Sequence, residues 1–330
     1  MFDKNYIVST YGFEKLESLA AMDIRQLRYF QAIYDHGSLL AASRRIHVAT
    51  TALSYHLARL EEELATPLFD RKPRGLAPTA AGERLHEHAT AILRALDIAV
   101  ADIREGGREI SGAIRVGMAY SAVKAIGVAL AKRMMAEHPK VQLGLNESLS
   151  GATLAYLMRS EVDIALVYNP PSDPRLKSVA LLVERMGCVG APDLIGPPDV
   201  PITVEEILTL PIIMLQQGVS SGAILNEVAL LKRIESSAVL KMNSVQAISG
   251  SLRERLGCTI GTKLSVSEAI AQGVLSFRPI VEPPLTRTLY LCELADRPQT
   301  YALEAVRRIL TDLVTQAVAQ GRWDAELVSE

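Results

Sequence analysis

The chain has 330 residues and 49% of them are hydrophobic, so it is long enough for two or three units with cores of their own. Its 35 Lys and Arg stand against 37 Asp and Glu, and a formal net charge of −2 excludes a chain-wide basic surface for nucleic acid or membrane. Three scattered cysteines without CxxC spacing argue against a disulfide framework and against a zinc site.

The beginning of the chain gives no targeting signal. Residues 1–21 include several charged side chains and no apolar core of signal-peptide length. No apolar run of the chain approaches the roughly 20 residues that a membrane helix needs. The run MDIRQLRYF at Met22 looks like a fresh start, so we expect residues 1–21 to be an extension with little structure. We expect a cytoplasmic protein that does not bind membranes.

Residues 22–79 contain three short helical patterns. Asp23 can cap a first helix that ends at His36-Gly37, and Ser38 can cap a second helix that ends near Ile46. A turn over 47–49 leads into a third helix over 50–63. Two short helices joined by a tight turn, the second with a polar face, are typical of a helix-turn-helix.

The pattern over 50–63 gives this helix two different faces. Leu53, Leu57, Leu60 and Leu64 form an apolar stripe at helical spacing. The opposite face carries hydrogen-bonding side chains, and no Asp or Glu occurs from His36 to Leu60. By itself the pattern also fits an ordinary amphipathic helix with a solvated face. An acid-free window in an acidic chain nevertheless indicates where a polyanion could approach.

The run from Arg71 to Leu76, RKPRGL, follows this helix and contains three cations and a glycine. This composition is suited to a hairpin wing that lies against phosphates. A solvated charged loop is the alternative interpretation.

The sequence from Met22 to Gly82, which contains these patterns without gaps, resembles the N-terminal domain of LysR-type transcriptional regulators. The resemblance implies a winged helix-turn-helix that binds partly palindromic promoter sites as paired domains, with RNA polymerase as a further expected partner. It assigns groove-facing positions to five residues of the third helix: Thr50, Thr51, Ser54, Tyr55 and Arg59. It assigns phosphate-facing positions, or positions beside them, to Ser38, Arg45, Arg71, Lys72 and Arg74.

One position departs from the family pattern. The family usually has Gln followed by Pro or Ser where this chain has Thr50-Thr51. A Gln amide can read adenine through two hydrogen bonds and a Thr side chain cannot, so the resemblance does not carry over the family's half-site preference. Ala49 is a poor helix cap, which leaves the Thr50 hydroxyl as an alternative cap.

Residues 80–107 read as a long linker helix with Thr79 as its cap. Its apolar residues repeat at spacings of four and three, which is a seam suited to pairing with a second copy. The seam consists of Leu85, Ala89, Ile92, Leu96, Ala99 and Ile103. Packing within the chain is the alternative. A palindromic site needs two recognition helices about 34 Å apart, which a dimer provides. The resemblance adds that such regulators are often homotetramers, so the sequence leaves homodimer and homotetramer open.

From Gly112 the pattern alternates between strands and helices, which implies a mainly parallel sheet with helices on both faces. The expected strands are 114–118, 141–147, 163–168, 186–190, 212–215, 240–242, 259–261, 274–278 and 285–294. The expected helices are 121–137, 151–160, 221–234, 244–256 and 299–320.

This half resembles the effector-binding domain of the same regulators, whose fold is similar to type 2 periplasmic binding proteins. The resemblance implies an α/β multidomain protein in which residues 112–320 form two lobes. Lobe one would take 112–184 and 285–320, and lobe two 185–284, with crossings near Glu184 and near Pro283-Pro284. The phrases LSGATLAYL and DIALVYNPPSDPRL resemble the nitrogen-assimilation branch of the family.

A small-molecule effector would bind beyond the carboxyl ends of strands, where helix N-termini point inward. The candidates at such positions are Ser121, Ser150, Thr153, Gln216, Ser220, Ser221 and Thr262. For each one alone, a plain helix cap is the alternative. None of these helix starts carries Arg or Lys, so a bound acid would depend on backbone N–H groups and hydroxyls.

Two other classes of function fit the sequence less well. The chain has no GxGxxG after a strand, no GxxxxGK[ST] and no GxSxG, and its six histidines all precede the sheet's second strand, which argues against an enzyme. A cytoplasmic small-molecule-binding α/β protein or enzyme, with N-terminal helices that serve assembly only, stays the alternative. A transport-type solute receptor is disfavoured by the helical residues in front of the sheet. No cofactor and no metal is expected.

Overall fold

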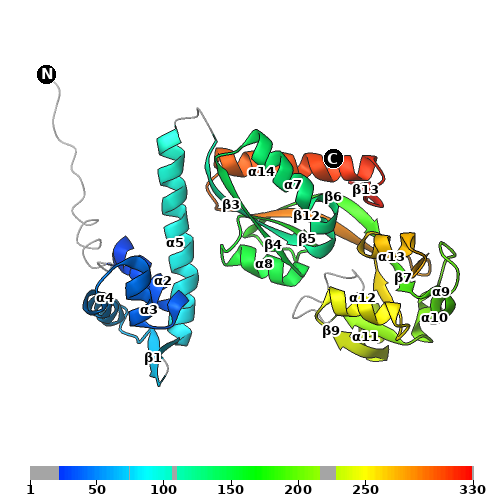
Figure 1. Cartoon of the computed structure of the whole chain (residues 1–330), viewed down its shortest axis with the longest axis horizontal. Coiled ribbons are helices and arrows are strands. Elements are labelled where there is room, and N and C mark those ends of the chain that lie inside the picture. The colour runs from blue at the N-terminus through cyan, green and yellow to red at the C-terminus, as the bar shows by residue number, and fades with distance from the viewer. Residues whose placement is uncertain (1–21, 74, 106–109, 216–227, 329–330) are drawn as a thin grey trace. The chain divides into compact units, whose positions relative to one another are not determined.

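The computed structural model describes residues 22–73, 75–105, 110–215 and 228–328 (Figure 1). The expectations for residues 1–21, Arg74, Gln216, Ser220 and Ser221 lie outside the described residues. The chain divides into two compact units with the boundary between Asp97 and Ile98.

The described residues of the first unit form three short helices, a two-stranded hairpin and most of a long helix. Its elements are α2 (Ile24–His36), α3 (Leu39–Ile46), α4 (Thr50–Glu63), β1 (Phe69–Lys72), β2 (Gly75–Pro78) and α5 (Ala80–Glu105), which crosses the boundary. The core of this unit joins α2, α4 and the first half of α5 through side chains such as Phe30, Leu53 and Ala89. The winged helix-turn-helix expected from the sequence is therefore confirmed, with α4 at the predicted bounds.

The helix starts in this unit follow from their caps. Asp23 and Gln26 form a reciprocal capping box at the start of α2, with Gln26 N donating to Asp23 Oδ1 at 2.7 Å. Ser38 Oγ accepts from Ala41 N at 3.1 Å, and Thr79 Oγ1 accepts from Gly82 N at 3.1 Å. All three caps were predicted from the sequence.

Two glycines let the hairpin approach the turn between α2 and α3. Gly37 ends α2 in the left-handed region, at φ +63°, where its N–H bonds to Ile33 O. Gly75 opens β2 at φ +133°, and a Cβ added there would meet Gly37 O at 2.4 Å. Leu76 N donates to the same carbonyl at 2.7 Å, which fixes the hairpin beside the helix-turn-helix.

The second unit alternates strands and helices. Its strands are β3 (Gly112–Ala119), β4 (Val141–Ser148), β5 (Ile164–Tyr168), β6 (Leu176–Arg185), β7 (Gly187–Gly190), β8 (Ile212–Leu215), β9 (Ala238–Met242), β10 (Thr259–Gly261), β11 (Ser276–Pro279), β12 (Thr286–Leu294) and β13 (Ala325–Leu327). Its α-helices are α6 (Tyr120–Ala122), α7 (Val128–Glu137), α8 (Ser150–Met158), α9 (Pro192–Ile195), α10 (Val204–Leu208), α11 (Val228–Ser237), α12 (Val245–Arg253), α13 (Ser267–Ala271) and α14 (Tyr301–Ala319). A π-helical turn (Val123–Gly127) joins α6 to α7, and a 3₁₀ turn (Leu264–Val266) precedes α13.

The largest sheet has the order β13-β6-β12-β5-β3-β4. Only β3 pairs in parallel, with β4 and β5, whereas β12 pairs antiparallel with both β5 and β6, and β13 antiparallel with β6. The prediction of a mainly parallel sheet is therefore wrong. The sequence analysis missed β6 and β13, and β12 inserts between β5 and β6 when the chain returns from elsewhere.

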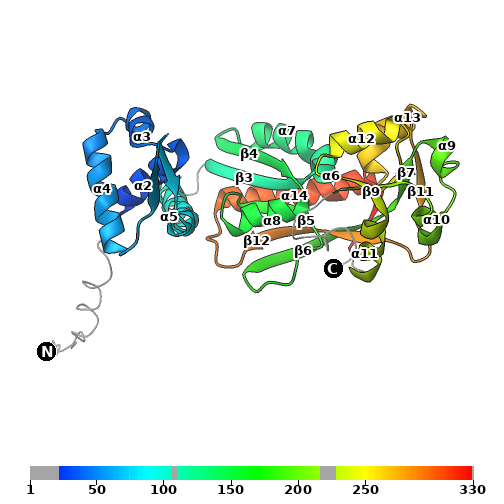
Figure 2. The same cartoon turned by 90° about the horizontal axis from the view of Figure 1, so that it is seen from below.

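Helices cover both faces of this sheet, and the alternation of side chains along β5 accounts for it. Ile164, Leu166 and Tyr168 join the core shared with α7 and α14, whereas Ala165 and Val167 join the core shared with α8. Figures 1 and 2 show α7 and α14 on one side and α8 on the other. We call this sheet and its helices the six-stranded lobe.

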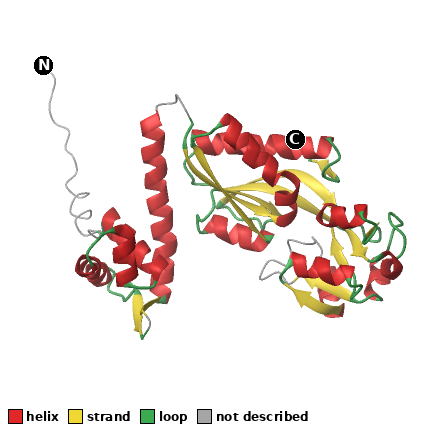
Figure 3. Cartoon of the chain, viewed as in Figure 1, coloured by secondary structure: helices red, strands yellow, loops and turns green. Residues whose placement is uncertain are grey.

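The segment between β6 and β12 builds a separate part, which we call the smaller lobe. It contains an antiparallel sheet of order β10-β7-β11 and a parallel pair β8-β9, surrounded by short helices (Figure 3). Two apolar cores lie inside it, one around Ile212 and Ile234 and one around Ile213 and Phe277. Strand β13 extends the six-stranded sheet beyond residue 320, the predicted end of lobe one. Within the described ranges, no helix is both long enough and apolar enough to cross a membrane.

Candidate nucleic-acid interface and candidate ligand cavity

The exposed face of α4 is the main feature of the first unit. Leu53, Leu57 and Leu60 are buried against the core, so the helix cannot rotate without exposing them. On the opposite face Thr51 and Arg59 are exposed and Tyr55 has 61% of its surface exposed. Thr50 and Ser54 are partly exposed beside them. A rigid scaffold thus presents hydroxyls, a phenol and a guanidinium to solvent.

The Tyr55 ring has a fixed neighbour that the sequence analysis did not single out. His56 lies edge-on to Tyr55, with ring centroids 5.6 Å apart, and edge-on to Tyr29 of α2 at 5.1 Å. His56 therefore connects the exposed phenol to α2. Only the spacing of Tyr29 and His56 on two packed helices could have indicated this contact.

The cations predicted beside the helix lie where a polyanion could reach them. Arg45 is exposed in the last turn of α3, and Arg71 and Lys72 are exposed on β1. Lys72 Nζ lies 3.5 Å from Asp70 Oδ2, and both side chains are more than half exposed, so solvent screens this pair. Ser38 Oγ is engaged as the α3 cap, which leaves its O–H available as a donor. Arg74 lies outside the described residues.

The predicted seam of α5 is divided between two environments. Ala89 is fully buried and presents no surface to a second copy, and Leu85 is partly buried against the core of the first unit. Ile92 and Ala99 are exposed, Leu96 is partly exposed, and the Ile103 side chain lies outside the described residues. The reason is that α2 packs along the first turns of this helix, where Tyr34 Oη donates to Glu83 Oε2 and Gln31 Nε2 donates to Thr90 Oγ1.

The second unit contains a cavity of about 360 Å³ between the six-stranded lobe and the smaller lobe. The smaller lobe contributes mainly apolar side chains, among them Met186, Met214 and Leu252. The six-stranded lobe contributes the ends of β3 and β5, the start of α8 and the start of β12, and polar side chains reach the cavity from both lobes. This size and composition are typical of a small-molecule site.

Three of the predicted effector residues line this cavity. Ser121 Oγ lies 2.9 Å from Tyr168 Oη, and Ser150 Oγ accepts from Tyr168 N at 3.2 Å. Thr262 is 2% exposed, and its hydroxyl has no hydrogen-bond partner among the described residues. An unpaired buried hydroxyl at a cavity wall is a group that a ligand could satisfy.

Thr153 does not line the cavity. Its Oγ1 donates to Leu149 O at 3.1 Å and lies 2.6 Å from Ser148 Oγ. A Cβ added at Gly117 would meet its methyl carbon at 2.8 Å, because Thr153 lies one turn inside α8 and points onto β3. The candidates Gln216, Ser220 and Ser221 lie outside the described residues.

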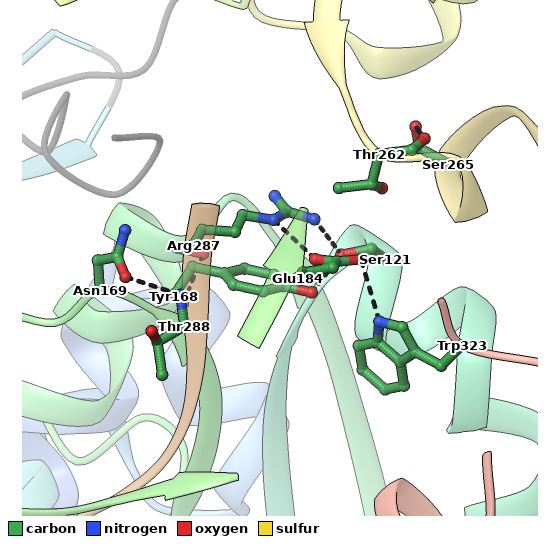
Figure 4. Close-up of polar contacts among 10 residues, drawn as sticks. Ser121, Tyr168, Asn169, Glu184, Thr262, Ser265, Arg287, Thr288 and Trp323 are labelled. Carbon is green, nitrogen blue, oxygen red and sulfur yellow. Dashed lines mark hydrogen bonds and ion pairs between the residues drawn. The ribbon is translucent and has the colours of Figure 1, made fainter. Parts of the chain in front are cut away.

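The sequence analysis missed Arg287, the charged residue at this cavity (Figure 4). Arg287 Nε donates to Glu184 Oε2 at 2.8 Å and Nη2 donates to Ser121 Oγ at 3.0 Å. Its guanidinium also lies over the Tyr168 ring, with the central carbon 3.6 Å from the ring centroid. Arg287 is the second residue of a strand, whereas the sequence pattern indicates ligand-binding groups mainly at helix starts.

Glu184 accepts a second hydrogen bond, from a buried tryptophan. Trp323 Nε1 donates to Glu184 Oε1 at 3.0 Å, and both residues are 1% exposed. Burial raises the pKa of the Tyr168 phenol, and burial together with Glu147 and Glu268 raises the pKa of Tyr120. Both phenols therefore stay protonated and uncharged at neutral pH.

Comparisons with known proteins identify a family for each of the two units. Residues 107–315 match the family described as LysR substrate binding domain, and residues 24–83 match that of bacterial regulatory helix-turn-helix proteins, lysR family. The first match alone spans more than half of the chain. The chain belongs to the LysR family.

The regulator is similar to two nitrogen assimilation regulatory proteins, nac of Klebsiella aerogenes and nac of Escherichia coli (strain K12). The identities are 29% and 28%, over 93% and 91% of this chain and 100% and 98% of those proteins. Full-length OxyR C199D from Pseudomonas aeruginosa shares the fold with a TM-score of 0.66 at 18% identity, over 94% of this chain and 99% of that one.

Full-length CbnR complexed with its target DNA shares the fold with a TM-score of 0.63 at 17% identity, over 90% of this chain and 100% of that one. The family and the similar curated proteins are transcriptional regulators, not enzymes. The chain is thus a DNA-binding transcriptional regulator with a substrate-binding domain for a small-molecule effector.

Proposed function

We propose that the regulator binds its promoter through α4 and the β1-β2 wing of two copies. In each copy the polar face of α4 enters a major groove, and Arg71 and Lys72 of the wing lie against phosphates. The observation that carries this proposal is the exposed row of Thr51, Tyr55 and Arg59 on a helix whose opposite face is fixed in the core. The absence of Asp and Glu from His36 to Leu60 lets a phosphate backbone approach this face.

The two copies pair through the second half of α5. Ile92 is 45% exposed and Val100 39%, so two large apolar side chains of this helix are open to contact with a second copy. A stem of this kind would set the separation of the two α4 helices to one turn of the duplex. A homodimer or a homotetramer built from such pairs meets this requirement.

The cavity between the lobes is the effector site. Its support is the combination of mainly apolar walls with convergent hydroxyls from Ser121, Ser150 and Thr262. A ligand that favours one arrangement of the lobes would shift the population of the regulator toward it and so change the spacing of the recognition helices. The regulator would act in the cytoplasm and in contact with RNA polymerase, and its likeness to the nac proteins supports a place beside that branch of the family.

The test is footprinting of the purified full-length regulator on the DNA upstream of its own coding sequence. We expect protection of two half-sites whose centres are about one helical turn, or a multiple of it, apart. An unrelated fragment of the same length and base composition is the control. Equal binding to both fragments, or a footprint confined to a single half-site, would contradict the paired arrangement.

A further inference from the structure

The charges that face the effector cavity are already balanced within the protein. Among the described residues that line it, Arg287 alone carries a formal charge at neutral pH. The neighbouring charged side chains Lys124, Glu147, Arg253 and Glu268 line an adjacent groove instead.

Glu184 neutralises Arg287 from behind the cavity wall. The two side chains form an ion pair of 2.8 Å, in which Glu184 is 1% and Arg287 17% exposed. Trp323 fixes the other carboxylate oxygen, so Glu184 cannot turn away without leaving a buried N–H unpaired. The guanidinium and its counter-ion are thus one neutral, rigid group.

Donors for a neutral ligand oxygen remain available. The third nitrogen of the Arg287 guanidinium points away from Glu184 and Ser121, toward the smaller lobe (Figure 4). The Thr262 hydroxyl on the opposite wall has no partner among the described residues. The first turn of α8, which starts at the cavity without a side-chain cap, adds backbone N–H groups that carry only a partial charge.

A ligand carboxylate would bind less favourably in this cavity than a neutral oxygen. It would bring a full negative charge into a largely apolar cavity whose one cation already has a buried carboxylate on it. Two carboxylates would then share one guanidinium, which disfavours the charged form of both. A carbonyl or hydroxyl oxygen takes the same donors without this penalty.

We propose that the effector is an uncharged, mainly apolar small molecule with a carbonyl or hydroxyl oxygen, and that the Glu184–Arg287 pair selects it against carboxylates. This inference rests on the proposed effector site. Glu184 acts here as a positioning and selecting residue, because it contacts Arg287 rather than the cavity itself.

The experiment compares matched amides and acids on the full-length protein at neutral pH. The probes are benzamide with benzoate, phenylacetamide with phenylacetate, and indole-3-acetamide with indole-3-acetate. Affinities come from titration calorimetry, and the Ser249→Trp variant, which places a large ring at the cavity wall, identifies binding inside the cavity. We expect the amide of each binding pair to bind at least about tenfold more tightly than its acid.

The Glu184→Gln variant tests the cause. Gln keeps an acceptor for Trp323 and removes the negative charge, so the preference for amides should shrink or reverse. The matched control is Glu293→Gln. Glu293 is a buried carboxylate of the same sheet, it pairs with Arg307, and it does not line the cavity. Its substitution should leave the preference for amides unchanged.

The wild-type comparison decides the proposal even if a variant fails to fold. Acids that bind the wild type as tightly as their amides would overturn selection against carboxylates and leave the cavity as the effector site. If no amide or acid of this set and no member of a broad fragment collection bound in the cavity, the effector site itself would fall, and this inference with it.

Discussion

Glu184 and Arg287 meet at the floor of the cavity, with Oε2 and Nε 2.8 Å apart, and each comes from a strand end where the chain crosses between the lobes. Glu184 is the penultimate residue of β6, which leaves the six-stranded sheet, and Arg287 is the second residue of β12, which returns to it. The ion pair therefore joins the two strands at the point where the chain crosses between the lobes.

Arg287→Ala should strongly destabilise the second unit. The substitution leaves the Glu184 carboxylate buried without its cation, and removal of one partner of such a pair costs about 3–5 kcal/mol. The measurement is the midpoint of denaturant unfolding followed by tryptophan fluorescence, since Trp323 is the only tryptophan in the chain. The control is Arg185→Ala, which breaks an exposed pair with Glu326 and should change the midpoint little. Equal effects of the two substitutions would contradict the role given to the buried pair.

Trp323→Phe should act on the same carboxylate as Arg287→Ala. Phe fills most of the space but cannot donate to Glu184 Oε1, which should cost about 1–3 kcal/mol. Because both substitutions remove donors from one group, their effects in the double variant should deviate from additivity by more than about 0.5 kcal/mol. Unfolding is followed by circular dichroism, since the variant lacks tryptophan. Additive effects would show that Glu184 does not couple the two residues.

Tyr34→Phe should remove a pH dependence from the first unit. Tyr34 Oη donates to Glu83 Oε2 at 2.5 Å, which joins α2 to α5, and burial together with this bond raises the pKa of Tyr34 to about 12. The folded state thus holds the phenol proton more tightly than the unfolded chain, whose phenol has an ordinary pKa near 10. The stabilisation is fully present below pH 10 and is lost as the pH rises toward 12.

The measurement for Tyr34 is the difference in unfolding midpoint between the wild type and Tyr34→Phe at several pH values. We expect a constant difference up to about pH 9 and a decline above pH 10. Other groups titrate over the same pH range in both proteins, so their contributions cancel in this difference. A difference that stays the same at all pH values would disprove the raised pKa.

Ile92→Asp should dissociate the paired form of the regulator. Ile92 is 45% exposed on α5, and a carboxylate there would be desolvated in a helix–helix seam. The mass measured by light scattering after size exclusion should fall to that of one chain or of a smaller oligomer. Glu87→Arg, which changes a charge on an exposed position roughly 140° around the helix, should leave the mass unchanged. An unchanged mass for Ile92→Asp would remove this part of α5 from the interface.

The sequence predicted the first unit almost completely because its signals are local. Caps at Asp23, Ser38 and Thr79, the glycine after His36 and the leucine stripe of α4 each act within a few residues, and each one is found where it was expected. The seam of α5 was predicted less well. Its first turns pack against α2, and that depends on how helices distant in the sequence come together.

The candidate site was predicted only in part for the same reason. Ser121, Ser150 and Thr262 follow strands directly, so their position at the sheet edge could be inferred from local order. Arg287 could not, because β12 pairs with β5, whose residues lie more than a hundred positions earlier in the chain. No local pattern indicates that β12 inserts antiparallel there, or that Glu184 and Trp323 meet it.

The most direct test of the account is a titration of the promoter fragment with the wild type and with Arg59→Ala at one fixed salt concentration. We expect Arg59→Ala to weaken binding by about 1–3 kcal/mol, which is roughly 5- to 150-fold in dissociation constant. The control is Arg28→Ala, since Arg28 pairs with Asp97 of α5 rather than facing outward from α4, and it should bind the fragment like the wild type. An affinity of Arg59→Ala equal to that of the wild type would contradict the assignment of the exposed face of α4 to DNA.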